Sequence, residues 1–251
     1  VIVGKDNLGS ITRVPDANYD KQTGEAEFAK TPDYFTYSYD TGRKGLPAMS
    51  VYFEMQNLTR GVALDEKAFP DAAFRTLLAD TADVNGNGQL STLELRRVSE
   101  LNCSGLGIAD LTGIEHFTQL VALNCENNEL TALDVSKNTH LSEIYCGGNR
   151  LATLDLTGLP IKDAETDTGH VQKLTGSYTL SGTENGVGLF DLSQIVGKDN
   201  IGSITEVKGA AYDKETGIAR YSAAVETPSY TYSTGSSAVS LTVEFALDLS
   251  K

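Results

Sequence analysis

A leucine pattern with a period of about 21 residues constrains the fold of this chain more than any other feature. Residues 120–133 and 141–154 both follow the form L-x-x-L/I-x-C-x-x-N-x-L-x-x-L. A segment of this length cannot bury its apolar edge alone, so each copy places a short strand beside the strand of its neighbour and adds leucines to a shared core. The pattern therefore predicts a short solenoid over residues 98–162.

The turn residues of the pattern indicate which solenoid it is. Asn128 and Asn149 stand at the bend of each coil, where an Asn side chain can bond main-chain groups that have no ladder partner. An earlier copy over residues 98–117 keeps the leucine offsets but has Leu106 at the Asn position. Atypical first repeats usually act as caps. We interpret residues 98–162 as two to three coils of a leucine-rich repeat.

The three cysteines fall at one repeat position. Cys103, Cys125 and Cys146 are spaced by 22 and 21 residues, which predicts an inward column of small apolar side chains. A zinc site or a disulfide is the alternative interpretation. The odd number of cysteines and the parallel directions of neighbouring side chains argue against both.

The charge balance excludes some classes of partner. The formal net charge is −14 and the isoelectric point is about 4.6, whereas nucleic acids and anionic lipids require clustered Lys and Arg. Divalent cations remain compatible with this charge. No stretch reaches the length of a membrane span, and Val1 is not followed by a signal-peptide pattern. We expect either a mature protein cut at this point or a fragment.

The two ends of the chain repeat one another. Residues 2–12 recur as 195–205, and six further residues between 17 and 24 recur at the same offset of 193. Thr31-Pro32 with residues 36–38 is matched by Thr227-Pro228 with residues 231–233. Alternating Tyr, Thr, Val and Phe runs predict strands in both copies. The sequence therefore predicts a duplicated all-β, sandwich-like module.

Only the second copy is preceded by further strand candidates. These lie at residues 177–181 and 188–193, and the first copy has no counterpart, so we expect residues 1–58 to be a truncated module. The longer protein would then hold at least two tandem units of solenoid and β-module. Four tyrosines could form a platform for sugar rings, but strand alternation favours packing against an opposing sheet; they are Tyr37, Tyr39, Tyr230 and Tyr232.

Residues 61–97 contain the motif with the most definite chemistry. Phe69-Pro70-Asp71 should open a helix with Pro70 in its first turn, and the buried stripe of this helix should be Phe74, Leu77 and Leu78. Residues 83–94 then match the twelve-residue EF-hand loop, including Gly88 at its sharp turn and Leu90 as its apolar plug. An exit helix should run from Ser91 to about Arg97. The predicted Ca²⁺ ligands are Asp83, Asn85, Asn87, Gln89 through its carbonyl, Ser91 and Glu94.

The predicted calcium site is weak and structural. Only Asp83 and Glu94 bring formal negative charge, so we expect a dissociation constant on the order of 10⁻⁵ to 10⁻³ M. The loop stands alone, and its exit helix leads directly into the first repeat, which favours a role in fixing the cap. The alternative is a loop that keeps its shape without metal through Asn and Asp bonds to its own backbone.

A helical EF-hand-like cap, leucine-rich repeats and a β-module in this order resemble the internalin-type surface proteins of bacteria. The form C-x-x-N-x-L-x-x-L-D-V-S-x-N-T over residues 125–139 resembles repeats of secreted bacterial proteins. The resemblance covers about residues 65–250 and implies a secreted or cell-surface location. It departs from the family in two respects: the family carries more repeats, and its cap loop lacks the intact ligand set found here.

Within this register, one face of the solenoid should present side chains to a partner. They are Glu100, Asn102, Asn124, Glu126, Glu143 and Tyr145. Tyr145 is the only large amphipathic residue among them, a type enriched at interface hot spots. The alternative is a solvated surface with no ligand.

No catalytic residues are predicted. His116, His140 and His170 have no companion nucleophile in a recognisable motif, and the carboxylates are dispersed. Two functions remain. The first is a non-catalytic module that binds a host or bacterial surface protein, or a glycan. The second is an architectural spacer of a longer surface protein, with no ligand of its own.

The fold class that we expect is therefore mixed α/β: a short leucine-rich-repeat solenoid with an EF-hand-like helical cap, flanked by two all-β modules. The expected domains are residues 1–60 (β-module), 61–97 (cap), 98–162 (repeats) and 163–251 (second β-module).

Overall fold

The computed structural model describes residues 10–14, 17–19, 26–28, 34–40, 49–54, 61–162, 171–222 and 227–248. Contacts divide the chain into two compact units, Val1–Val62 with Gln89–Leu93, and Ala63–Gly88 with Glu94–Lys251. The domain boundaries expected at residues 60, 97 and 162 stay predictions.

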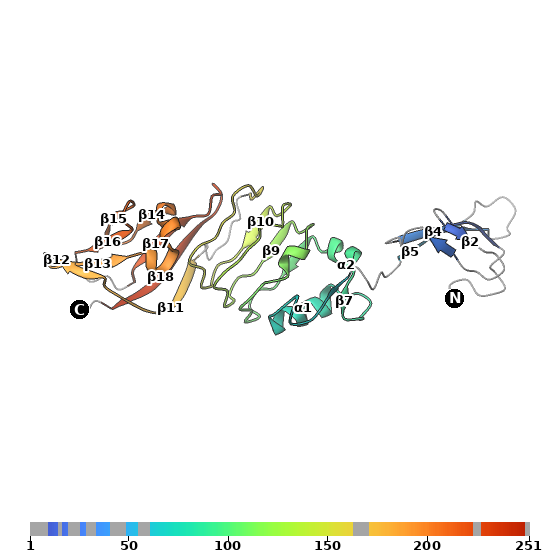
Figure 1. Ribbon diagram of the computed structural model, residues 1–251, viewed down its shortest axis with the longest axis horizontal. Helices are drawn as coiled ribbons and strands as arrows, with labels where there is room; N and C mark the ends of the chain where they lie inside the picture. Colours follow the sequence, from blue (N-terminus) through green and yellow to red (C-terminus); the bar gives the residue numbers. More distant parts are fainter. Residues whose placement is uncertain are drawn as a thin grey trace. The chain divides into compact units, whose positions relative to one another are not determined.

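The first unit contains a small antiparallel sheet in the order β1-β4-β5 and a separate two-stranded ribbon, β2-β3 (Figure 1). Ile11 and Tyr37 are buried. A further short pair joins β6 and β7. Much of the sequence echo, including residues 2–9 and Thr31-Pro32, lies outside the described residues. The strands are β1 (Ile11–Arg13), β2 (Ala17–Tyr19), β3 (Ala26–Phe28), β4 (Tyr34–Tyr39), β5 (Met49–Glu54), β6 (Val62–Ala63) and β7 (Gln89–Leu90).

The cap consists of α1 (Ala72–Thr81) and α2 (Thr92–Arg97). Asp71 is the N-cap of α1, so Pro70 lies before the helix and not in its first turn as predicted. The reason is that the Asp71 carboxylate accepts hydrogen bonds from the Ala73 and Phe74 amides, which fixes the start of the helix one residue later. Phe74 and Leu78 are buried as expected, whereas Leu77 is half-buried. The exit helix begins at Thr92, not Ser91.

The cap packs on the first coil through an aromatic cluster. The ring of fully buried Phe69 lies 5.9 Å from that of Phe74 and 6.5 Å from that of Phe117. A Cβ at Gly113, where φ is 103°, would lie 2.2 Å from the Phe69 ring. Gly113 is therefore required by both its backbone conformation and the close approach of the cap.

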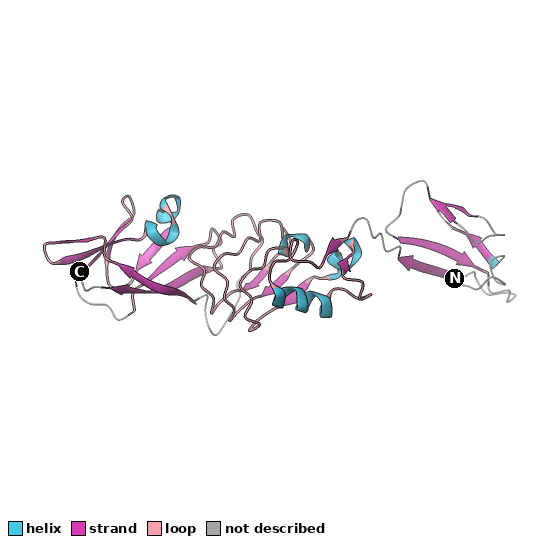
Figure 2. Cartoon of the chain, turned by 60° about the horizontal axis from the view of Figure 1, so that its bottom comes forward, coloured by secondary structure: helices cyan, strands magenta, loops and turns pink. Residues whose placement is uncertain are grey.

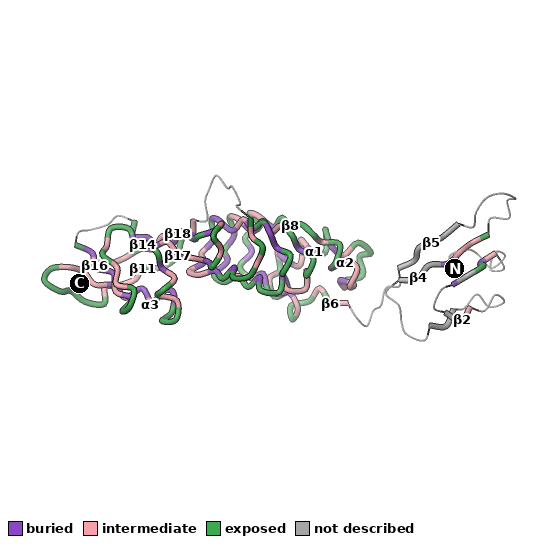
Figure 3. Tube along the Cα trace, turned by 90° about the horizontal axis from the view of Figure 1, so that it is seen from above, coloured by how far each residue is buried: buried purple, intermediate pink, exposed green. Residues whose placement is uncertain are grey.

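The predicted repeats form a solenoid of parallel strands. β8 (Glu100–Asn102), β9 (Ala122–Asn124) and β10 (Glu143–Tyr145) pair in register, and η2 (Ile114–His116) lies in the first coil (Figure 1). The middle residue of each strand is buried. All three cysteines are fully buried thiols with no disulfide, which confirms the inward column. Figure 3 shows buried residues recurring along each coil between half-buried and exposed ones.

Asparagine side chains join successive coils. The Asn149 Nδ2 group donates to the Cys125 and Cys146 carbonyls, while its Oδ1 accepts from the Leu130 amide. Asn128 makes the corresponding bonds one coil earlier, and its Oδ1 also accepts from Leu106 N. Each Asn therefore links its own coil to the preceding one. The first repeat has Leu106 at the Asn position because no earlier repeat coil has to be linked to it. Leu106 is accordingly 45% exposed.

A glutamine from the second β-module continues this ladder. Gln172 is fully buried, its Oε1 accepts from Leu151 N at 3.1 Å, and its Nε2 donates to the Cys146 carbonyl at 2.9 Å. Gln172 belongs to β11, so the last coil is closed by the first strand of the β-module. Buried main-chain groups at that open edge are thereby satisfied.

The second β-module is a sandwich of two four-stranded sheets, β11-β18-β17-β14 and β12-β13-β16-β15 (Figure 2). The sheets pack through Phe190 and Phe245, whose rings are stacked 5.5 Å apart. The predicted strand at 188–193 ends at Asp191, because Ser193 begins a short helix. The elements are β11 (Val171–Thr179), β12 (Gly182–Glu184), β13 (Val187–Asp191), α3 (Ser193–Val196), η3 (Lys198–Ser203), β14 (Ile204–Val207), β15 (Ala211–Asp213), β16 (Ile218–Tyr221), β17 (Ser229–Ser233) and β18 (Ser240–Asp248).

The tyrosines are core residues, as predicted. Tyr37, Tyr230 and Tyr232 are buried and Tyr39 is half-buried. The predicted match of residues 36–38 with residues 231–233 is wrong by two residues, however. Ile11 pairs with Tyr39, and its equivalent Ile204 pairs with Tyr232. The offset therefore stays at 193 here, and residue 37 corresponds to Tyr230. A two-residue slip keeps the same strand face, so identity alone could not reject it.

The solenoid and the second module are also bonded directly. Leu156 N donates to the Thr234 carbonyl at 2.8 Å, and the Tyr230 hydroxyl donates to the Ala152 carbonyl at 2.9 Å. Among the described residues, no helix is long and apolar enough to cross a membrane.

Candidate functional site

The three solenoid strands place most of the predicted partner residues on one face, which we call the strand face. Its outward positions are Glu100, Ala122 and Glu143 in one row and Asn102, Asn124 and Tyr145 in the next. Strand alternation causes this, because the residue between the two outward positions points into the core. Glu126 follows β9 and is half-buried. These outward positions hold two carboxylates and no Lys or Arg.

Two residues of the strand face also have a local structural role. Asn102 Oδ1 accepts from the Ser104 amide at 3.1 Å, and Asn124 Oδ1 accepts from the Glu126 amide at 3.1 Å. Both side chains thus turn the chain out of its strand. Tyr145 remains half-exposed at the end of its row and offers an aromatic surface beside acidic groups. The face can contact a partner through hydrogen bonds, a ring and negative charge.

The predicted metal loop forms a tight turn between α1 and α2. The Asp83 carboxylate accepts from the Gly88 amide at 2.8 Å and from the Asn87 amide at 3.2 Å. Gly86 and Gly88 have φ values of 67° and 76°, a conformation that glycine adopts without strain. The loop therefore bends around the carboxylate at its first position.

The last loop residue reaches back to the first part of the loop. Glu94 is only 3% exposed, and its Oε1 accepts from Val84 N at 3.0 Å and Asn85 Nδ2 at 2.7 Å. The two carboxylates predicted as ligands thus both belong to one loop network. The Asn85 amide would have to rotate for its oxygen to face a cation.

The donor set fits a hard cation in part. Asp83, Asn85, Asn87 and Glu94 supply oxygen atoms from the second compact unit. Gln89 lies in β7 and Ser91 is half-buried, and both belong to the first unit, so their roles as ligands rest on the sequence alone. No group of three His, Cys, Asp or Glu suited to a metal lies within the described parts of the chain. A site here would depend on amide and carbonyl oxygens, as a weak calcium site does.

Asp71 fastens the cap to the repeats. Its Oδ2 accepts from the Ala109 amide at 2.9 Å, while Oδ1 caps α1. Burial raises the pKa of this carboxyl, but hydrogen bonds from Ala109, Phe74 and Ala73 outweigh it, so the pKa lies below its ordinary value. The clamp weakens when acid protonates Asp71. The sequence marks Asp71 as favourable at a helix start, but no local pattern indicates its contact with Ala109, 38 residues away.

The cysteine column has no electrostatic feature of a reactive site. Burial raises the pKa of the Cys103 and Cys146 thiols to about 12, and the pKa of Cys125 is also raised by burial and by its neighbours. The thiolate, which is the nucleophile and the metal ligand, is therefore suppressed at neutral pH. His116 lies edge-on to Phe69, and His140 Nδ1 contacts the Thr118 carbonyl, so both have structural contacts. His170 lies outside the described residues.

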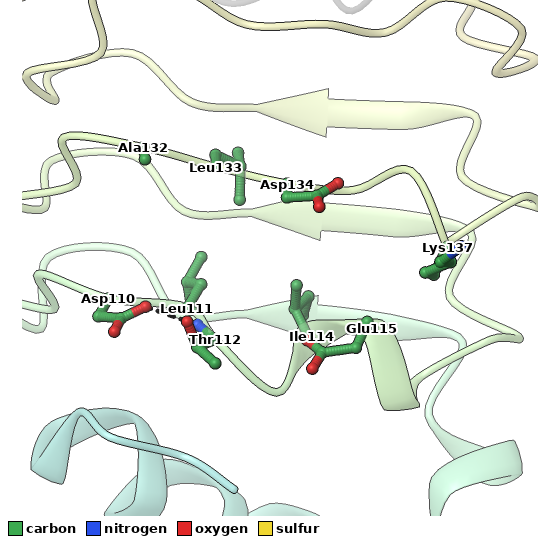
Figure 4. A pocket seen from close by; sticks show the side chains of 9 residues that line it. All are labelled: Asp110, Leu111, Thr112, Ile114, Glu115, Ala132, Leu133, Asp134 and Lys137. Atoms are coloured by element: carbon green, nitrogen blue, oxygen red, sulfur yellow. Dashed lines mark hydrogen bonds between the residues drawn. The ribbon is translucent and has the colours of Figure 1, made fainter. Parts of the chain in front are cut away.

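A groove of about 340 Å³ lies between the first two coils, and its lining residues are outside the three strands (Figure 4). Its polar rim includes Asp110, Glu115, Asp134 and Lys137. Asp110 and Asp134 each accept a hydrogen bond from the amide two residues later, so these carboxylates shape turns. The sequence signal for these turns is a recurring triplet: Asp-Leu-Thr at 110, Asp-Val-Ser at 134 and Asp-Leu-Thr at 155.

The fold and the strand face together define a capped leucine-rich-repeat protein fused to a β-sandwich. No family model matches the chain. A stretch of 71 residues, 28% of this chain, is 38% identical to Internalin J of Listeria monocytogenes, and it spans 8% of that protein. This match confirms the resemblance to internalin-type leucine-rich-repeat proteins of bacteria. The chain covers only a small part of that relative.

Two solved structures from Listeria monocytogenes are similar at low identity. The internalin InlF gives a TM-score of 0.36 at 22% identity, covering 47% of this chain and 33% of InlF. The functional domain of InlJ, described as including a cysteine ladder, gives 0.34 at 18% identity, covering 60% of this chain and 41% of that domain.

Proposed function

We propose that this protein is a non-catalytic interaction module of the bacterial surface or of the secreted fraction, which binds a protein partner through the strand face. The observation that supports this proposal is the in-register row of Asn102, Asn124 and Tyr145 beside Glu100 and Glu143. A half-exposed tyrosine surrounded by hydrogen-bonding groups is the kind of anchor that dominates interface energy. A glycan is the second class of ligand that the same face could hold.

Binding of the purified chain to extracellular-matrix proteins, mucins and glycans tests this proposal. Saturable binding should fall at least tenfold in the double variant Tyr145→Ala/Glu126→Ala, since hot-spot residues contribute about 2 kcal/mol or more. Lys137→Ala, in the groove outside the strands, is the matched control and should bind as the parent does. Equal binding by the double variant would reject the strand face as the site.

We also propose that the loop over residues 83–94 binds Ca²⁺ and thereby stiffens the cap. Asp83 and Glu94 would supply the charge, and Asn85 and Asn87 the neutral oxygens. The pairing of Glu94 with Val84 and Asn85 supports this, because the twelfth position already closes over the loop. Calcium would act on the cap and not at the strand face.

Titration calorimetry and thermal unfolding with Ca²⁺ test the loop. At a calcium concentration a hundredfold above the dissociation constant, the folded state should gain about 2.7 kcal/mol. Glu94→Gln should abolish this gain, whereas Asp80→Asn, on an exposed residue of α1, should retain it. A gain that survives Glu94→Gln would place the cation elsewhere.

The alternative function is an architectural spacer in a longer surface protein with tandem units. Direct bonds between the solenoid and the second module favour it, since Gln172, Tyr230 and Thr234 tie the two parts together. The sequence echo at an offset of 193 also favours it. No saturable ligand, together with a thermal midpoint that rises with Ca²⁺, would support the spacer over the binding module.

A further inference from the structure

The loop over residues 83–94 contains a dipeptide whose chemistry its proposed metal site does not use. Asparagine followed by glycine occurs three times in the chain: at 85–86 and 87–88 in this loop, and at 185–186 between β12 and β13. In such a pair the glycine main-chain nitrogen can attack the asparagine side-chain amide, because glycine has no Cβ to obstruct the approach. Each pair is therefore a candidate site of deamidation, and its surroundings decide whether it reacts.

The reaction needs water and no enzyme or cofactor. The glycine nitrogen forms a bond to the asparagine Cγ, the bond from Cγ to Nδ2 breaks, and the glycine amide proton leaves with Nδ2 as ammonia. Water then opens the resulting five-membered succinimide ring. Opening at the side-chain carbonyl gives aspartate, and opening at the main-chain carbonyl gives isoaspartate, whose main chain is longer. Ammonia is released and water is consumed, with no change of oxidation state.

A strong hydrogen bond protects the second pair of the loop. The attacking nitrogen must give up its proton, so an amide that donates to a charged acceptor is a poor nucleophile. Gly88 N donates to the Asp83 carboxylate at 2.8 Å, and the Gly88 carbonyl accepts from Leu64 N at 3.0 Å. Gly88 is thus held through both of its main-chain groups, and we expect Asn87 to keep its amide.

The hairpin between β12 and β13 restrains the third pair. Glu184 pairs with Val187 across the turn, and Asn185 and Gly186 have φ values of 51° and 80°. Both values lie in the left-handed region that two-residue hairpin turns prefer. Ring closure rotates the peptide between these two residues, and the paired strands on either side resist this rotation. We therefore expect slow reaction at Asn185.

The first pair of the loop has the most weakly held nucleophile. Gly86 N lies 3.3 Å from the Asp83 carbonyl oxygen, which is neutral and beyond the usual distance of an N–H···O hydrogen bond. Asn85 and Gly86 are both exposed, and neither belongs to a helix or a strand. Ring closure at this pair therefore breaks the least main-chain structure of the three.

We propose that Asn85 deamidates, and that the aspartate formed converts the loop from one that is closed without metal into one that requires Ca²⁺. In the unmodified chain, Asn85 Nδ2 donates to Glu94 Oε1 at 2.7 Å, so the asparagine itself joins the two parts of the loop. An aspartate at position 85 has no such donor and places a second negative charge against Glu94. A cation between the two carboxylates relieves this repulsion.

This inference rests on the proposed calcium site and adds a time-dependent step to it. The EF-hand pattern accepts Asp or Asn at its third position, so an aspartate there keeps the ligand pattern. It adds a third charged ligand to Asp83 and Glu94, and ligand charge tunes calcium affinity. Bound calcium should in turn slow the reaction, because an Asn85 side chain held by the cation is not free to reach Gly86 N.

Peptide mapping by mass spectrometry tests the site. The full chain is incubated at mildly alkaline pH with Ca²⁺ or with chelator, and digested at intervals. In chelator, Asn85 should lose its amide at least about tenfold faster than Asn87, a factor that matches the loss of one hydrogen bond to a charged group. Calcium should slow the loss at Asn85. Loss at Asn87 or Asn185 as fast as at Asn85 would overturn the proposal.

A defined variant tests the consequence. Asn85→Asp should bind Ca²⁺ about tenfold more tightly than the parent in titration calorimetry, because it carries one more charged ligand. In chelator it should unfold at a lower temperature than the parent, because the bond to Glu94 is replaced by repulsion. Asn185→Asp adds the same charge at an exposed hairpin turn and is the matched control, so it should equal the parent in both measurements.

The outcomes separate this inference from the proposed calcium function. A parent chain that binds no Ca²⁺, beside an Asn85→Asp variant that does, would reject calcium binding by the unmodified loop and support the conversion. Equal calcium affinity of the parent and Asn85→Asp would support the proposed site and overturn the conversion. Absence of calcium binding by both proteins would reject both.

Discussion

The two β-modules pair their common strands alike, and among the described residues the second is bonded directly to the solenoid. The sheet of β1, β4 and β5 has the same strand order as the sheet of β14, β17 and β18. β1 and β14 carry the same bulge. β11 adds a fourth strand to the second sheet, and its Gln172 closes the asparagine ladder. A repeated sequence thus reproduces local pairing, whereas β11, which lies outside the repeated residues, brings the second sheet into contact with the solenoid.

Replacing Gln172 should have the largest effect on this comparison. Gln172→Leu leaves the buried Leu151 amide without this acceptor and removes one of the two side-chain hydrogen bonds to the Cys146 carbonyl, so we expect a loss of about 2–4 kcal/mol in the free energy of unfolding. Chemical denaturation measures this loss, and hydrogen exchange should localise it to the last coil and β11. Lys173→Ala, at an exposed neighbour, should cost under about 0.5 kcal/mol. A comparable loss in both variants would contradict the role of Gln172 as a ladder residue.

Alkaline pH should destabilise the second β-module through Tyr221, a position at which the first module has no ionisable side chain. Burial raises the pKa of Tyr221 to about 12, and no described residue forms a hydrogen bond with its hydroxyl, whereas the first module carries Phe28 at the equivalent position. Because the folded pKa is raised, the folded state binds more protons between pH 10 and 12, and stability falls there by about 2–3 kcal/mol.

Tyr221→Phe tests this directly by making the second module like the first. The variant should equal or exceed the parent in stability below pH 10, and its advantage should grow between pH 10 and 12. Denaturation at a series of pH values gives both quantities, and the cysteine column, common to both proteins, cancels in the difference. A pH-independent difference would contradict the assignment.

Removing the Tyr230 hydroxyl should have a smaller effect on the link to the solenoid. Tyr230→Phe loses one hydrogen bond to the Ala152 carbonyl, and we expect a loss of about 1 kcal/mol. The thermal midpoint measures it. Tyr232→Phe, on the same strand, is the comparison variant and should cost less. The reverse order would show that the link does not depend on Tyr230.

The bulge threonines should give the smallest and most similar effects. Thr12→Val and Thr205→Val each remove an exposed hydroxyl bond, so we expect about 0.5 kcal/mol or less in each. Local hydrogen exchange of the paired strands, β4 and β17, detects such a change. A marked inequality would show that the shared bulge is not equally stabilising in the two modules.

The sequence alone determined the solenoid, because leucines, cysteines and asparagines at a fixed spacing allow one arrangement in which each coil satisfies the next. The same periodicity predicted the buried cysteines. Five of the six predicted partner residues also lie on the three adjoining strands, as expected. The helix–loop–helix order of the cap also followed from local signals, although its first helix starts at Ala72 because Asp71 acts as the N-cap.

The tertiary structure supplied contacts that no repeat spacing in the sequence indicates. Gln172 lies 23 residues after Asn149, in a strand of another module, and only the packed chain shows that it replaces the next ladder asparagine. The Asp71 clamp on Ala109 and the two-residue correction to the tyrosine alignment likewise depend on partners distant in the sequence. Local pattern fixes which face of an element is buried, whereas the identity of the group that satisfies an exposed edge is settled only when the chain brings two edges together.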